Sequence, residues 1–223
     1  MKEFKLTRSN RKTLALHIRD GCVEVRAPFG MPEYRISAFI AKKEKWIETK
    51  LAESISRVKQ RESFSLSYGD DIRYRGALYR ITEGQGDKCG FTDTCLYVPP
   101  DLSPGQIKIH CTDILKIQAA GLFSYVARHY TRLMAVSPAG FRISNAKTIW
   151  GSCSAQKRVN ISWRLIMADD GVIEYIIIHE LAHLIELNHS ARFWAIVERY
   201  IPDYKARRAR LHALQRELSY EDW

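Results

Sequence analysis

The segment from Val172 to Leu187 constrains the fold more than any other part of the chain, because it is strongly apolar and contains no helix breaker. Asp169 or Asp170 precedes it, and aspartate is a residue type that caps the start of a helix. In such surroundings every unpaired polar group costs several kcal/mol, roughly. We therefore expect an uninterrupted helix in an apolar environment, whose few polar side chains need a specific reason to be there.

Those polar side chains follow the pattern H-E-x-x-H. His179 and His183 are four positions apart, which places them on one helix face with β-carbons about 5–6 Å apart. Two imidazoles in this arrangement can bind one zinc ion at about 2.0–2.1 Å. Glu180 is rotated by roughly 100° from His179 and can reach a zinc-bound water. We predict a zinc site with Glu180 as general base, in preference to a pair of core histidines with a surface glutamate.

The third ligand has two candidates. His189 follows Asn188, a residue type that tolerates the left-handed conformation needed to end the helix and turn the chain back. The spacing from His183 to His189 equals that of the third histidine in metzincins, although Glu186 stands where their glycine would be. Glu198 is the competing ligand, since a helix-borne glutamate has this role in thermolysin-like enzymes. We predict His179, His183 and His189 as the ligands and Zn²⁺ as the cofactor.

The rest of the chain alternates between strand and helix patterns. Strand-like segments are expected at 13–18, 22–26, 72–75, 78–81, 96–98 and 107–109, and helices at 36–61 and 113–136. Asp20-Gly21 suits the tight turn of a hairpin between the first two strands. This indicates an α+β fold with a small β-rich N-terminal region and one long helix (1–110), followed by a zincin-like domain that contains the metal-binding helix (111–223).

Composition limits the class of protein and its partners. Lys and Arg total 35 against 25 acidic residues, a net charge of +10 that favours nucleic acid, nucleotides or an acidic protein as partners, or serves solubility alone. The five cysteines include no C-x-x-C pair, which argues against a disulfide framework and a structural zinc ribbon. No apolar run approaches the ~20 residues of a membrane span, and the first residues are charged where a signal peptide is apolar. We expect a cytoplasmic protein without a membrane segment.

Several short motifs together carry a family resemblance. They are Trp150-Gly-Ser-Cys-Ser154, His179-Glu-Leu-Ala-His-Leu184, Asn188-His-Ser190, Phe193-Trp194 and, near the N-terminus, Lys45-Trp-Ile47. With them the chain resembles the YgjP-like zinc metallopeptidases, which are related to SprT-like and WLM-type proteases, over nearly its whole length. The resemblance implies the same three histidine ligands and Glu180 as base. Ser162 and Asp169 stand where relatives are expected to carry Asn and Pro.

The expected activity is hydrolysis by a zinc-activated water with a glutamate general base. The resemblance favours a peptide or protein substrate. A nucleoside-triphosphate pyrophosphatase is the alternative, since the same water could attack phosphorus and the charge of +10 suits a polyanion. Two further alternatives are a nucleic-acid-associated protease and a nucleic-acid-binding module with a structural metal. Two further questions concern the site. Residues 149–153 form either a core strand or a strand with an open edge that binds a peptide. The candidates for the residue that donates a hydrogen bond to the oxyanion of the transition state are Tyr200, Tyr204, Arg142 and His212.

Overall fold

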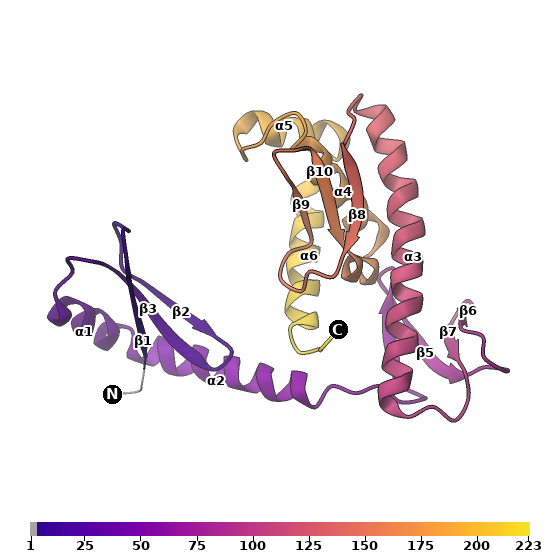
Figure 1. Cartoon of the computed structure of the whole chain (residues 1–223), viewed down its shortest axis with the longest axis horizontal. Helices are drawn as coiled ribbons and strands as arrows, with labels where there is room; N and C mark the ends of the chain where they lie inside the picture. The colour runs from indigo at the N-terminus through magenta and orange to yellow at the C-terminus, as the bar shows by residue number, and fades with distance from the viewer. Residues whose placement is uncertain (1–3) are drawn as a thin grey trace. The chain divides into compact units, whose positions relative to one another are not determined.

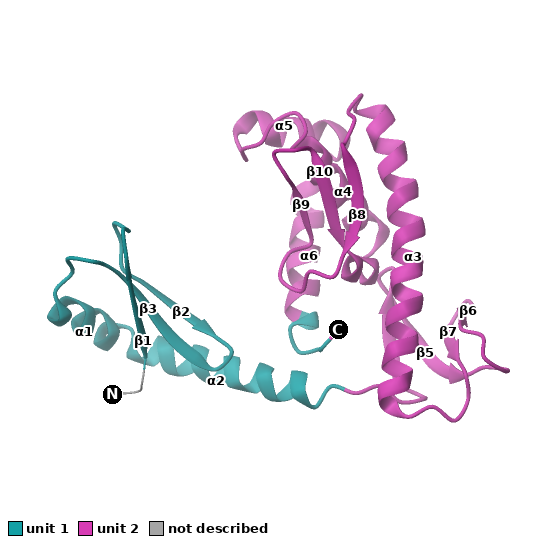
Figure 2. Ribbon diagram, viewed as in Figure 1, with its two compact units in different colours: residues 1–64, 217–222 teal, residues 65–216, 223 magenta. Residues whose placement is uncertain are grey.

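The computed structural model describes residues 4–223, which divide into two compact units (Figure 2). One comprises residues up to 64 together with 217–222, and the other comprises residues 65–216 together with 223. The boundary predicted near residue 110 lies inside a continuous helix, α3 (Pro104–Leu133). Helices and small sheets occur in both units, so the expected α+β class is confirmed.

The first unit is a three-stranded sheet with two helices (Figure 1). Strand β3 (Cys22–Pro28) is central, with β1 (Lys5–Ser9) parallel to it and β2 (Ala15–Arg19) antiparallel. Asp20 and Gly21 link β2 to β3 with positive φ angles of 49° and 74°, as the predicted hairpin turn requires. The single helix expected over 36–61 is two helices, α1 (Glu33–Lys42) and α2 (Glu44–Glu62), because Lys43 leaves the helical conformation at φ −107° and ψ 8°.

The second unit begins with a four-stranded sheet. Its strands are β4 (Asp71–Tyr74), β5 (Ala77–Glu83), β6 (Gly90–Phe91) and β7 (Cys95–Val98), in the order β4-β5-β7-β6. The strand expected at 107–109 is wrong, because those residues lie in α3. Ser103 and Gln106 form a capping box and Pro104 occupies the first turn, a combination that starts a helix well before the predicted residue 113.

A second sheet of this unit lies beside the predicted metal-binding helix. Its strands β8 (Gly140–Ser144), β9 (Gly151–Cys153) and β10 (Arg158–Ser162) have the order β8-β10-β9, with β9 antiparallel to β10. After the 3₁₀ helix Trp163–Met167 come α4 (Asp170–Ala182), α5 (Ala191–Tyr200) and α6 (Tyr204–Leu218). Contacts with α3, α5, β9 and β10 surround α4, which explains its apolar sequence on all sides. No helix in the described part of the chain is long and apolar enough to cross a membrane.

Candidate metal centre

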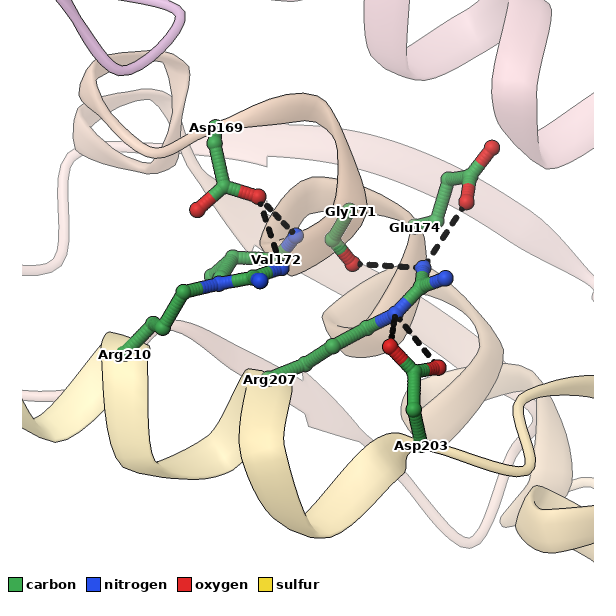
Figure 3. Close-up of polar contacts among 7 residues, drawn as sticks. All are labelled: Asp169, Gly171, Val172, Glu174, Asp203, Arg207 and Arg210. Atoms are coloured by element: carbon green, nitrogen blue, oxygen red, sulfur yellow. Dashed lines mark hydrogen bonds and ion pairs between the residues drawn. The ribbon is translucent and has the colours of Figure 1, made fainter.

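Helix α4 is held firmly at its first turn. The Asp169 carboxylate caps the helix by accepting a hydrogen bond from the Val172 N–H at 3.1 Å. The same carboxylate accepts a hydrogen bond from the Arg210 guanidinium at 3.0 Å. Arg207 donates to the Gly171 carbonyl and to the Glu174 carboxylate, both at 2.9 Å (Figure 3). Of the two aspartates predicted as caps, Asp169 is therefore the helix cap.

The other end of α4 differs from the prediction. The helix ends at Ala182, with His183 as its cap, rather than at Leu187. The Leu184 and Ile185 N–H groups donate to carbonyls three residues earlier, which tightens the last turn. Asn188 does not have a positive φ, so the left-handed turn proposed for it is wrong. The chain reverses through the tightened turns after His183 instead.

Three imidazoles meet where the chain reverses. The ligand-competent atoms of His179, His183 and His189 all lie within 4.8 Å of one another. The Nε2 atoms of His179 and His189 are 3.0 Å apart. A tetrahedral ion with bonds of about 2.0–2.1 Å would hold its ligand atoms roughly 3.3 Å apart, so this spacing is close to what metal binding needs. His183 Nδ1 lies 3.1 Å from the Glu186 carbonyl oxygen and donates to it, which leaves its Nε2 lone pair for a metal.

An aromatic side chain fixes the three rings. Phe193, fully buried on α5, has its ring centroid 4.8 Å from that of His179, 4.5 Å from His183 and 4.7 Å from His189. Ser190 caps α5 by accepting the Phe193 N–H at 3.3 Å, so the residue after the third histidine starts the helix that carries the phenyl ring. The phenyl ring therefore packs against all three imidazoles.

The surroundings of His179 and His183 favour neutral imidazoles. Burial lowers the pKa of His179 to about 3, and the neighbouring His183 and His189 contribute to the shift. Burial also lowers the pKa of His183. Neutral rings offer lone pairs to a cation, and the donor set therefore fits a metal ion.

Glu180 lies beside the histidines and against β9. Its side chain is 5% exposed, and burial raises its pKa to about 8. A β-carbon added at Gly151 would lie 2.6 Å from both Cγ and Oε1 of Glu180, so the glycine backbone forms the wall against which the carboxylate rests. A cation among the histidines would favour the ionised carboxylate and lower this pKa again.

The other predicted site residues lie elsewhere. Glu198 is exposed on α5 and does not belong to the three-histidine cluster. Of the oxyanion candidates, Tyr204 is stacked on Trp194 at 5.1 Å, and Trp194 in turn lies 5.8 Å from His179 and 5.7 Å from His189, all between ring centroids. In the described residues, no ring contact or hydrogen bond joins Tyr200, Arg142 or His212 to the histidines.

Two neighbours of the cluster were not predicted. Tyr175 has an edge contact with His179, at 5.9 Å between ring centroids, and it precedes His179 by one helical turn, a spacing that would have pointed to it. Arg208 lies with its guanidinium carbon 5.5 Å from the Trp194 ring centroid. The sequence did not single out Arg208.

Comparison with known proteins gives one family and one solved structure. The family model described as "YgjP-like, metallopeptidase domain" matches residues 12–214. The crystal structure of the metallopeptidase zymogen of Pyrococcus abyssi abylysin is 24% identical over 41% of this chain and 92% of that chain, with a TM-score of 0.38. No curated protein matches the chain.

Proposed function

Because the chain belongs to the YgjP-like metallopeptidase family, we propose that it is a zinc-dependent peptidase with His179, His183 and His189 as ligands and Glu180 as general base. One observation carries this proposal: three imidazoles converge within 4.8 Å beside a buried carboxylate. The chemistry of the donor set suggests zinc, because three neutral nitrogens leave a fourth position of a tetrahedral ion open, as in catalytic zinc sites.

When bound, zinc supplies a Lewis acid that lowers the pKa of water to about 7 and polarises a carbonyl. The protein's own contribution is to hold and move a proton. Glu180 is rotated away from the ligand face of α4, rests on Gly151, and has no competing hydrogen bond among the described residues. It accepts the proton of the attacking water and passes it to the leaving amine.

Strand β9 supports a peptide as substrate. The Ser162 N–H donates to the Trp150 carbonyl, and the Ser154 N–H donates to the Arg158 carbonyl, so even-numbered residues of this stretch face β10. The backbone groups of Gly151 and Cys153 consequently point to the opposite side, since the direction alternates along a strand. In the described residues β9 pairs with β10 alone, which leaves an open edge directly beside Glu180. An extended peptide adds to such an edge through main-chain hydrogen bonds.

Cys153, in the same strand, is not a second nucleophile. Burial, with a contribution from the charge of Glu180, raises the pKa of its thiol. A thiol in that state is mainly protonated near neutral pH and reacts poorly. The nucleophile assigned to this site is therefore water.

The first experiment separates the peptide from the nucleotide reading. Protein is stripped with a chelator, reloaded with zinc, and assayed on casein, a library of short peptides and the four ribonucleoside triphosphates. We expect zinc-dependent peptide cleavage. Triphosphate hydrolysis without peptide cleavage would replace the proposal with the phosphoanhydride alternative.

Two variants test the assigned roles. His183→Ala should lose most of the bound zinc in elemental analysis, because one of three nitrogen ligands is removed. Glu180→Gln should keep the zinc and lose at least about 10²–10⁴-fold in turnover, since an amide of the same shape cannot accept the proton. Full zinc occupancy in the first variant, or near-normal turnover in the second, would contradict the assignment.

A further inference from the structure

Helix α6 carries three arginines in four positions, and two of them have structural partners. Arg207 is 2.9 Å from both Asp203 and Glu174, and Arg210 is 3.0 Å from Asp169 (Figure 3). The pairs with Glu174 and Asp169 lock α6 onto the start of α4, whereas Asp203 lies directly before α6 itself. Arg208 lies between them in sequence but is rotated by about 100° from Arg207 around the helix, and its side chain therefore leaves α6 in another direction.

Arg208 points along the aromatic side of the metal centre. It shares a helix face with Tyr204, one turn earlier, and both side chains contact Trp194. Trp194 in turn lies beside the rings of His179 and His189. One indole ring thus separates the guanidinium from the histidine cluster, a distance that about three residues of extended peptide would span at ~3.3 Å each.

No carboxylate of the described residues forms an ion pair with Arg208, which is exposed. Its guanidinium is a fixed positive charge one indole ring away from His179 and His189. A metal held by three neutral histidines would add a second positive centre nearby. Two such centres repel each other, and an anion placed between them would stabilise both.

We propose that Arg208 binds a carboxylate of the peptide substrate, either an acidic side chain or the C-terminal carboxylate, within about three residues of the cleaved bond. The inference rests on the proposed peptidase function and adds a substrate preference to it. Arginine suits this role because its planar guanidinium binds carboxylates with two parallel hydrogen bonds. Stacking on Trp194 holds the guanidinium in place at little entropic cost when substrate arrives.

Kinetics on matched peptides measure this preference. The substrates are internally quenched fluorescent octapeptides that carry Glu or Gln at each position in turn. Their C-terminus is either a free acid or an amide, which separates an acidic side chain from the C-terminal carboxylate as the group that Arg208 binds. We expect wild-type protein to prefer one acidic position by about 10–100-fold in kcat/KM, mainly through KM, as for a hydrogen bond to a charged group. Arg208→Gln should abolish this preference, Arg208→Lys should retain part of it, and Arg210→Gln, a paired neighbour on the same helix, should leave it intact.

A binding measurement gives a second readout that does not depend on turnover. The same acidic and neutral peptides, labelled with fluorescein, are titrated onto Glu180→Gln and onto the Glu180→Gln/Arg208→Gln double variant. The acidic peptide should bind the first variant more tightly, and the difference should vanish in the second and shrink as salt is raised.

The outcomes separate this inference from the proposed function. Peptide cleavage without an acidic preference, or with a preference that survives Arg208→Gln, overturns the role of Arg208 and leaves the peptidase proposal standing. Absence of peptide cleavage, together with Arg208-dependent binding of inorganic triphosphate alone, overturns both. Circular dichroism melts of each variant verify that the comparison is made on folded protein.

Discussion

Replacing Gly151 by alanine should disable the site through a single methyl group. The added β-carbon would lie 2.6 Å from Cγ and Oε1 of Glu180, whereas carbon atoms pack at about 3.5–4.0 Å. Glu180 is buried and cannot swing into solvent, so the strand and the carboxylate must separate by about 1 Å. Misplacement of a catalytic group by that distance costs on the order of 10²-fold in rate.

The same substitution should leave the ligands undisturbed. None of the three histidines is among the nearest atoms to the added carbon, so we expect full zinc occupancy and a loss of about 1–3 kcal/mol in the free energy of unfolding from overpacking. The assay is kcat/KM on a cleaved peptide, with elemental zinc analysis and urea denaturation on the same preparation. Gly140→Ala in β8 is the matched control, because its added carbon meets only Arg158 Cγ at 4.0 Å.

Two results would refute this reasoning. If Gly151→Ala retains activity within about twofold of wild type, the wall formed by β9 does not position Glu180 to the accuracy that catalysis requires. If activity and zinc are lost together, the substitution acts on the metal ligands instead. Normal activity in Gly140→Ala is needed in either case to assign the effect to Glu180.

Three further predictions address the ligands, their packing and the helix that carries them. His189→Ala should weaken zinc affinity in a chelator competition while Glu198→Ala should not, because Glu198 lies outside the cluster; the reverse order would restore the thermolysin-like ligand set. Phe193→Ala should lower the free energy of unfolding by about 3–5 kcal/mol and weaken zinc binding, since it leaves a cavity beneath three imidazoles, and an unchanged urea midpoint would argue against that packing role. Asp169→Ala should lower the free energy of unfolding by about 1 kcal/mol through loss of the α4 cap, as measured by urea denaturation. Asp169→Asn retains a capping oxygen and should lower it clearly less. Equal losses in the two variants would mean that the ion pair with Arg210 stabilises the protein more than the cap does.

The sequence was most informative where one short segment determines geometry. Helix spacing alone brought His179, Glu180 and His183 to the same region, and the Asp20-Gly21 turn followed from two residue types that accept positive φ. His189 was reached by a wrong route, because the chain turns through tightened hydrogen bonds after His183 and not through Asn188. The ligand roles of the three histidines and the role of Glu180 as base remain predictions, as do zinc and the cytoplasmic location.

What sequence reasoning missed depends on contacts between distant segments. Gly151 matters because its backbone lies against Glu180, and Arg208 matters because its guanidinium lies against Trp194. The residues of each pair are far apart in sequence, so neither pair forms a local pattern. The start of α3 was missed for a different reason: Ile107 and Ile109 are typical of strands, but the capping box at Ser103 overrides that propensity. Local capping chemistry decided the element, and in the resulting helix Ile107 is buried whereas Ile109 is exposed.

The attachment of α6 to both neighbours of the site has a consequence for how the molecule opens. Arg207 and Arg210 fasten α6 to the first turn of α4, while Tyr204 stacks on the indole of α5. Fraying of α6 would therefore withdraw Arg210 from the capping carboxylate of Asp169 and Tyr204 from Trp194 in one event. Such elements exchange their amide hydrogens through a shared opening with a single free energy. We therefore expect the predicted ligand histidines, the predicted base and the proposed substrate arginine to belong to one cooperative unit.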